Sequence, residues 1–421
     1  MSIENTRPAL PPARWLFTGS MVLATTVALV SGVPLGFFAA TSTGLEDRWP
    51  EVVQAHGRLQ LGAWASVFVV ALAFEFLPRL NERPWLPAGP RAATIGLLLA
   101  GAVLQAWALA TRGDWLMAPA VAISFAGALA FLALVLHLRA RKPLVENPQA
   151  LFFPAAAAWL AVAAALSLVS EFRSDSRVVP LEDSRLVVEV LTRGFLLNAV
   201  IAVALRAFPE HFGLPVVPKP VQLLALVGIS GTLAVWLVGS GAVGLPDSEA
   251  ARRISDCALP LILLATTISM GILTRLPPLR GSEPARILIP LAWVGLVVYA
   301  GALVITAILA DSAELTLYEQ GAVRHVFLLG FIAPLILAMG HLVLAHFGPG
   351  AVPWPALLNL SVLLAVISWP LRTAPMLWED VPGTVEQTLM GVSGVLLSLS
   401  LSLSLAVYVR STSNLAAESA P

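Results

Sequence analysis

Apolar residues fill most of the chain in long runs, which are separated by short stretches rich in charged residues, proline or glycine. A helix needs roughly 20 mostly apolar residues to cross a bilayer. The sequence contains twelve such runs, which we number as spans one to twelve. They lie near residues 14–40, 57–79, 91–111, 116–138, 152–170, 186–208, 220–240, 257–276, 286–310, 324–346, 354–371 and 387–409. The pattern therefore predicts an all-α polytopic membrane protein, with one transmembrane domain covering residues 1–421.

The last run contains a stretch of period two, which reads LLSLSLSLSL from Leu396 to Leu405. That period is typical of a strand. An unpaired strand in lipid would leave its backbone groups without hydrogen bonds. We therefore expect a helix whose serine hydroxyls donate back to carbonyl groups of the same helix.

Composition agrees with this class, because 58% of the residues are hydrophobic and only 12% are charged. The single cysteine, Cys257, excludes an intrachain disulfide and any CxxC metal site. The sequence holds no Walker loop, no GxSxG and no HExxH motif. It also lacks the basic stretch expected of a nucleic-acid-binding protein. The expected surroundings are the lipid bilayer, with no nucleic-acid partner.

The charges in the loops predict an orientation. If the N-terminus is cytoplasmic, the loops on that side carry more basic than acidic residues, and the opposite loops carry the reverse. We therefore expect both termini in the cytoplasm and the first span retained as a helix rather than cleaved as a signal peptide. Even-numbered spans then run from the outer face inward.

Spans two, six and ten resemble one another. They end FEFLPRL, ALRAFPEHFG and LVLAHFG, and spans six and ten begin RGFLL and RHVFLL. The similar segments recur at intervals of roughly 130 to 140 residues, which indicates three units of four helices. These units would cover about 14–138, 152–276 and 286–409.

Two of the six histidines lie at the outer ends of even-numbered spans. His56 begins span two and His325 begins span ten, so we expect them at one depth. Two imidazoles from separate helices suit a six-coordinate haem, which needs neutral nitrogens above and below its iron and an apolar slot around it. His341 is about 24 Å further along span ten and cannot share a metal with His325. For it and for His137, His211 and His346, contacts at helix ends or in loops are the simpler interpretation.

Residues near the two histidines fit such a site. Gln60 lies one turn below His56 and is expected to bond its second ring nitrogen, which would fix the tautomer. Arg58 and Arg324 are expected to pair with the haem propionates. Arginines at helix ends also extend to the membrane–water interface without any ligand, which is the alternative interpretation. Glycines would leave room for a flat cofactor at positions Gly57, Gly62, Gly330 and Gly340.

These segments resemble a known family. The motif AHGxxQxxxWxxxF from Ala55, the FLPR that ends span two, and RHxFLLGFIxxxI from Arg324 are similar to NnrS membrane proteins of the nitric-oxide response. More distantly, they resemble the catalytic subunit of haem-copper oxidases and nitric-oxide reductases. The resemblance implies three arcs of four helices, with a low-spin haem b held by His56 and His325. It also implies a bacterial inner membrane, and nitric oxide or a redox protein as partner.

The sequence departs from that superfamily where a second metal centre would be. The oxidases have a further haem ligand beside the first on helix ten and copper ligands on helices six and seven. Here Phe327 follows His325 by two residues, Gly194 is the counterpart of His325 in span six, and spans six and seven hold no histidine. Many NnrS proteins carry HxH where this chain has Gln54 before His56, which puts copper in doubt. The departures argue against a terminal oxidase.

Three functions remain open from the sequence. The first is a haem-binding protein of the NnrS-like group, which serves in nitrosative stress or in electron or gas-ligand handling. The second is a secondary transporter, since twelve helices, repeats and prolines within spans also suit that class. Transporters usually place polar groups at the bilayer midplane. Here the midplane holds few polar residues beyond Gln105 and Asn198, which argues against that class. The third is a cofactor-free assembly or sensor subunit. A divergent respiratory subunit that resembles the oxidase catalytic subunit is a further alternative.

Overall fold

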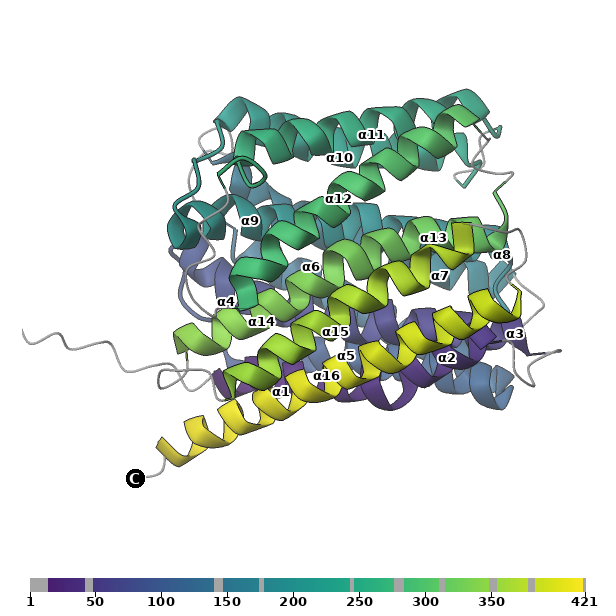
Figure 1. Ribbon diagram of the computed structural model, residues 1–421. Helices are drawn as coiled ribbons and strands as arrows, with labels where there is room; N and C mark the ends of the chain where they lie inside the picture. Colours follow the sequence, from purple (N-terminus) through teal and green to yellow (C-terminus); the bar gives the residue numbers. More distant parts are fainter. Residues whose placement is uncertain are drawn as a thin grey trace, which may run out of the picture.

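The computed structural model describes residues 14–41, 48–139, 147–173, 178–242, 246–275, 284–309, 315–347, 354–377 and 383–418. Within these residues, twelve helical segments are long and apolar enough to cross a membrane, and no strand is present. The all-α polytopic fold is confirmed (Figure 1).

The spans are built from these elements in chain order: α1, η1 and α2 (Arg14–Val27, Ala28–Gly32, Val33–Thr41); α3, η2 and α4 (Trp49–Gly57, Arg58–Ser66, Val67–Leu80); α5 (Ala88–Thr111); α6 (Asp114–His137); η3 and α7 (Pro148–Leu151, Phe152–Arg173); α8, η4 and α9 (Leu181–Glu189, Val190–Leu196, Leu197–Phe212). The second half contains α10 (Lys219–Gly239); α11 (Glu249–Met270); α12 (Pro284–Leu309); α13, η5 and α14 (Leu317–Phe327, Leu328–Ile332, Ala333–Phe347); α15 and η6 (Pro355–Thr373, Pro375–Leu377); and α16 (Thr384–Glu418).

Spans two, six and ten form the centre of the bundle. Of their most apolar stretches 89%, 78% and 72% of the residues are buried, against 33–56% in the other described spans. Figure 1 shows α13 and α14 through the middle, with α10 and α11 along one edge and α16 along the opposite edge. All three central spans contain a π-helical segment, η2, η4 and η5, and span one contains another, η1. The division into three repeats stays a prediction.

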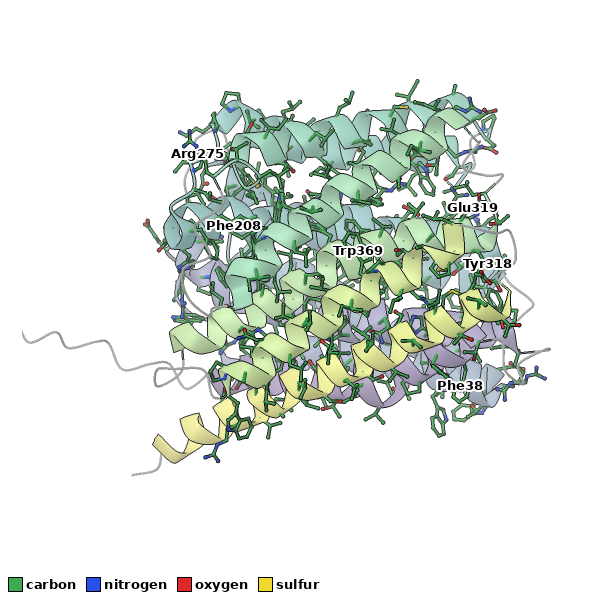
Figure 2. The ribbon with its side chains drawn as sticks, in the orientation of Figure 1. Phe38, Phe208, Arg275, Tyr318, Glu319 and Trp369 are labelled. Carbon is green, nitrogen blue, oxygen red and sulfur yellow. The ribbon has the colours of Figure 1, made fainter. Side chains whose placement is uncertain are left out.

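Helices α3 and α13 begin earlier than the hydrophobic pattern predicts. Pro50 occupies the first turn of α3, where its missing N–H costs nothing. Thr316 caps α13, and its side chain and that of Glu319 each accept the other's backbone N–H. His56 and His325 therefore lie roughly 11 and 12 Å inside their helices rather than at the ends. Figure 2 places Tyr318 and Glu319 at the end of the bundle opposite Arg275.

The period-two segment lies in the helix α16, as expected. Ser398 and Ser402 donate to carbonyls four residues earlier, at 2.9 and 2.8 Å. Ser400 and Ser404 do not follow that expectation, because both bond Ser361 of α15. The Ser361 hydroxyl lies 2.7 Å from Ser404 Oγ, and Ser400 Oγ donates to the Ser361 carbonyl at 2.8 Å. Interhelical hydrogen bonds of this kind hold helices together where lipid supplies no hydrophobic drive.

Candidate cofactor site

His56 and His325 line the same internal space, as their predicted depths require. They border a cavity of about 390 Å³, the imidazole cavity, and a smaller one of about 70 Å³, the side cavity. Both cavities are lined by His56, Gln60, Leu61, His325, Leu328 and Arg372. The imidazole cavity is lined by residues of spans one to six and ten to twelve, and the side cavity by residues of spans one, two, ten, eleven and twelve. The histidine pair thus stands where the two meet.

Backbone carbonyls orient both imidazoles. His56 Nδ1 lies 2.7 Å from the Gly32 carbonyl in η1, and His325 Nδ1 lies 2.6 Å from the Gly321 carbonyl one turn earlier in α13. A neutral imidazole that donates from Nδ1 keeps Nε2 as its acceptor. Each ring therefore offers Nε2 to a metal, in the arrangement that second-sphere hydrogen bonds give to metal-bound histidines.

The predicted tautomer-fixing bond from Gln60 is wrong, because the Gly32 carbonyl takes that place. Gln60 faces Gly32 instead, and a methyl group at Gly32 would lie 2.6 Å from Gln60 Nε2. This amide nitrogen is buried and has no hydrogen-bond partner among the described residues. Gln60 still lines both cavities, so it remains a candidate contact for whatever occupies them.

The glycines near the histidines differ in role. A methyl group at Gly36 would lie 2.5 Å from His56 Cε1, so this unpredicted glycine makes room for the ring. Gly57 and Gly62 both line the imidazole cavity as expected, and a methyl group at Gly57 would have no atom within 4 Å. Gly330 instead allows the Trp369 ring of α15 to approach, and Gly340 lies against Tyr408. These last two serve helix packing rather than a flat cofactor.

Three arginines border the imidazole cavity. Arg58 Nη1 lies 3.3 Å from Ser167 Oγ. Arg324 Nε lies 3.9 Å from Glu189 Oε1, too far for a hydrogen bond, and its buried Nε and Nη2 have no hydrogen-bond partner among the described residues. Buried guanidinium donors of this kind fit an anionic ligand.

Arg372 of α15 is the third arginine, and sequence analysis missed it. It is buried, borders both cavities beside the two histidines, and forms no ion pair with a described carboxylate. An arginine near the end of an apolar run, in WPLRT, is itself a sign of function. Its neighbours come from spans two and ten, far away in sequence, so the sequence could not relate it to the histidines.

A buried charge network lies behind Arg324. Arg193 forms an ion pair with Glu189, with its Nε 2.7 Å from Glu189 Oε2, and its Nη1 donates a hydrogen bond of 2.6 Å to Asp256 Oδ1. The Arg193 guanidinium also stands 5.6 Å from the centre of the Trp236 ring. This chain of contacts links spans six, seven, eight and ten and reaches the cavity through Arg324.

Aromatic side chains fill the place where a second metal centre was considered. Phe327 packs against Tyr299 and Phe331, with ring centres 4.8 and 5.5 Å apart. Trp293 packs between Phe208 and Phe331 at 4.9 and 5.3 Å. A methyl group at Gly194 would lie 2.7 Å from Trp159 Cγ. The described residues contain no group of three or more His, Cys, Asp or Glu side chains placed to hold a metal ion.

His341 differs from its interpretation as a helix-end residue. It is buried in α14, its ring centre lies 5.6 Å from that of Tyr408, and neither ring nitrogen has a hydrogen-bond partner among the described residues. His137 is exposed at the end of α6, as expected. The His346 side chain lies outside the described residues.

The volume of the imidazole cavity, about 390 Å³, falls in the range of sites for small molecules and cofactors.

Comparison with known proteins bears on the fold. No family model matches the sequence. No curated protein matches it either. Among solved structures, the chain is similar to a haem-copper terminal oxidase that forms a dimer, with a TM-score of 0.71 and 14% identity, over 98% of this chain and 85% of that chain. The chain has a haem-copper oxidase fold. The predicted oxidase-like arrangement of twelve helices is thereby confirmed, and membership of the NnrS family is not.

Proposed function

We propose that this chain is a haem-binding integral membrane protein, in which His56 and His325 are the two axial ligands of one haem b. The observation that carries the proposal is the paired orientation of the rings. Each Nδ1 is bonded to a backbone carbonyl, and both rings border the same cavities. The oxidase-like fold supports the proposal, and spans two and ten, which carry the two histidines, are among the most buried of the bundle.

The residues around the pair suit a porphyrin. Arg58, Arg324 and Arg372 would bind the propionate carboxylates, which are the only charged groups at the edge of the ring. Apolar side chains such as Leu61 and Leu328 would contact its faces. A haem with two histidine ligands has no open iron position and supplies one-electron transfer. The protein would contribute ligand orientation, charge balance and exclusion of water.

A haem-copper centre has no support from the residues present. Phe327, two residues past His325, packs against Tyr299 and Phe331. The histidine of span six, His211, lies in the last turn of α9, roughly 25 Å along the helix from Gly194, and span seven has none. We therefore propose electron handling in a bacterial inner membrane, within a nitric-oxide response such as that of NnrS proteins. The partner would be a redox protein, and nitric oxide would bind the iron only if one histidine left it. A divergent oxidase subunit is the alternative that the fold also allows.

The visible spectrum of the detergent-purified full chain, expressed with adequate haem, tests the proposal. The wild type should show reduced-minus-oxidised bands of a low-spin haem with two histidine ligands. His56→Ala and His325→Ala should each lose these bands, while His137→Ala, at an exposed helix end, should keep them. A wild type without a Soret band would refute haem binding. Unchanged spectra in both ligand variants would refute the ligand assignment.

A further inference from the structure

The imidazole cavity reaches the surface of the protein at one end. Pro50, in the first turn of α3, lines the cavity and is exposed. Trp49 and Tyr318, whose ring centres lie 6.4 Å apart, also line the cavity there. Figure 1 shows α3, α8 and α13 at this same end of the bundle, which the charges in the loops predict to be outer. We call this end of the cavity its mouth.

A short backbone segment, Val178–Pro180, lies at the mouth directly before α8. Val178 and Val179 line the cavity, and Val179 is buried, whereas Pro180 is exposed. The segment therefore separates the cavity from the surroundings of the protein. Helix α8 is held in another way, because Ser170 Oγ of α7 donates to Asp183 Oδ2 at 2.5 Å. The segment can thus move without displacing the helix that follows it.

The side chain of Gln54 holds this segment. Gln54 Nε2 donates a hydrogen bond of 2.7 Å to the Val179 carbonyl, and the Val179 N–H donates to Gln54 Oε1 at 3.2 Å. These are the two hydrogen bonds that the Val179 backbone makes among the described residues. Gln54, whose place before His56 puts copper in doubt, therefore uses both ends of its amide on a backbone far away in sequence.

Two neutral hydrogen bonds form a weak closure. Each contributes modestly, because water replaces the lost partner when a group near the surface is released. Moving one of the surrounding helices would instead break its packing and its interhelical bonds over the whole length of the span. Segments that open readily have few buried apolar contacts and backbone hydrogen bonds near solvent. Release of Val179 from Gln54 therefore opens the cavity at small cost.

We propose that Gln54 latches Val178–Pro180 across the mouth of the imidazole cavity, and that release of this latch admits the occupant of the cavity from the water phase. Gln54 acts on access and does not touch the iron. The inference rests on the proposed function for the identity of the occupant, a haem. The latch itself can be measured without haem, so the two proposals fail separately.

Thiol labelling of the full chain in nanodiscs tests the latch. Gly57→Cys places a thiol in the cavity about 4.5 Å along the helix from Gln54, where an added methyl group has no atom within 4 Å. Cys257→Ala removes the native thiol. The probe is 2-sulfonatoethyl methanethiosulfonate, an anion that does not cross membranes, and intact mass measures its rate of reaction. Gln54→Leu conserves volume, loses both hydrogen bonds and should raise this rate at least fivefold.

Two controls separate the latch from general loosening of the bundle. Gln222→Leu removes a comparable bond away from the cavity, from Gln222 Nε2 to the Val217 carbonyl at 2.8 Å, and should leave the rate within about twofold. The native Cys257 of α11, in protein that keeps Gly57, should react at the same rate with and without Gln54→Leu. Equal labelling at position 57 with and without Gln54→Leu overturns the proposal, as does an equal rise at Cys257.

Release of haem provides the second arm. Transfer of haem from the detergent-purified protein to excess apomyoglobin, followed in the Soret band, should be at least fivefold faster for Gln54→Leu. The low-spin bands should keep their positions, because both histidines stay in place. Equal release rates overturn the passage of haem through the mouth. A wild type without a Soret band refutes the proposed function, and the thiol labelling then decides the latch alone.

Discussion

Arg193 in span six donates a hydrogen bond of 2.6 Å to Asp256 in span eight, and both side chains are buried. Asp256→Leu keeps the Arg193–Glu189 ion pair but leaves Arg193 Nη1 without its acceptor. We expect this variant to destabilise the protein by roughly 1–3 kcal/mol, the cost of a buried donor without a partner. The measurement is the free energy of unfolding in detergent.

The exposed pair of Arg206 and Glu210 is the control for this change. Glu210→Gln should alter stability by less than about 0.5 kcal/mol. Arg193→Met should cost more than Asp256→Leu, because it takes the partner from two buried carboxylates, Glu189 and Asp256. An Asp256→Leu protein as stable as the Glu210→Gln protein would contradict the importance of the network.

Arg372 should control both haem retention and potential. Arg372→Met removes a positive charge that favours the reduced state, so the midpoint potential should fall by roughly 60 mV, which is a tenfold change for one electron. Redox titration of the haem band measures this. Arg206→Met changes an exposed arginine and should leave the potential unchanged. A rise in potential for Arg372→Met would show that this arginine does not face the haem.

Glu189 should act in the opposite direction. It lies beside Arg324 at the cavity edge, and Glu189→Gln removes a negative charge that favours the oxidised state. The midpoint potential should therefore rise, again by roughly 60 mV. Glu182→Gln, two turns earlier on the exposed side of α8, is the matched control. Equal potentials for the two variants would place Glu189 outside the electrostatic field of the haem.

Gly36 should matter for the geometry of the haem ligand. The added methyl group in Gly36→Ala would lie 2.5 Å from His56 Cε1, so the ring must turn and its bond to the Gly32 carbonyl must break. We expect lower haem content and an altered low-spin electron paramagnetic resonance signal. Gly96→Ala is the control, since Gly96 is exposed in α5, lines neither cavity and has no atom within 4 Å of the added methyl group, and alanine favours a helix by about 1 kcal/mol. A wild-type signal from Gly36→Ala would refute the predicted contact.

The sequence by itself determined the twelve spans, because a bilayer requires each crossing to be apolar over its own length, and that requirement can be read locally. It also singled out His56 and His325, since polar residues stand out in an apolar run. Helix starts were less readable. They depend on capping residues such as Thr316 and Glu319, which lie outside the apolar pattern.

Only the tertiary structure decided which groups meet. The Gly32 carbonyl rather than Gln60 orients His56, Arg372 joins the histidines from span eleven, and Ser361 pairs with the serines of α16. The bonds between Gln54 and the Val179 backbone likewise appear only once spans two and six are packed. In lipid, every span follows the same local rule, which is to be apolar over its length and to satisfy its own backbone hydrogen bonds. The partners of a polar side chain are therefore set by packing between helices that are distant in sequence, which the apolar pattern does not encode.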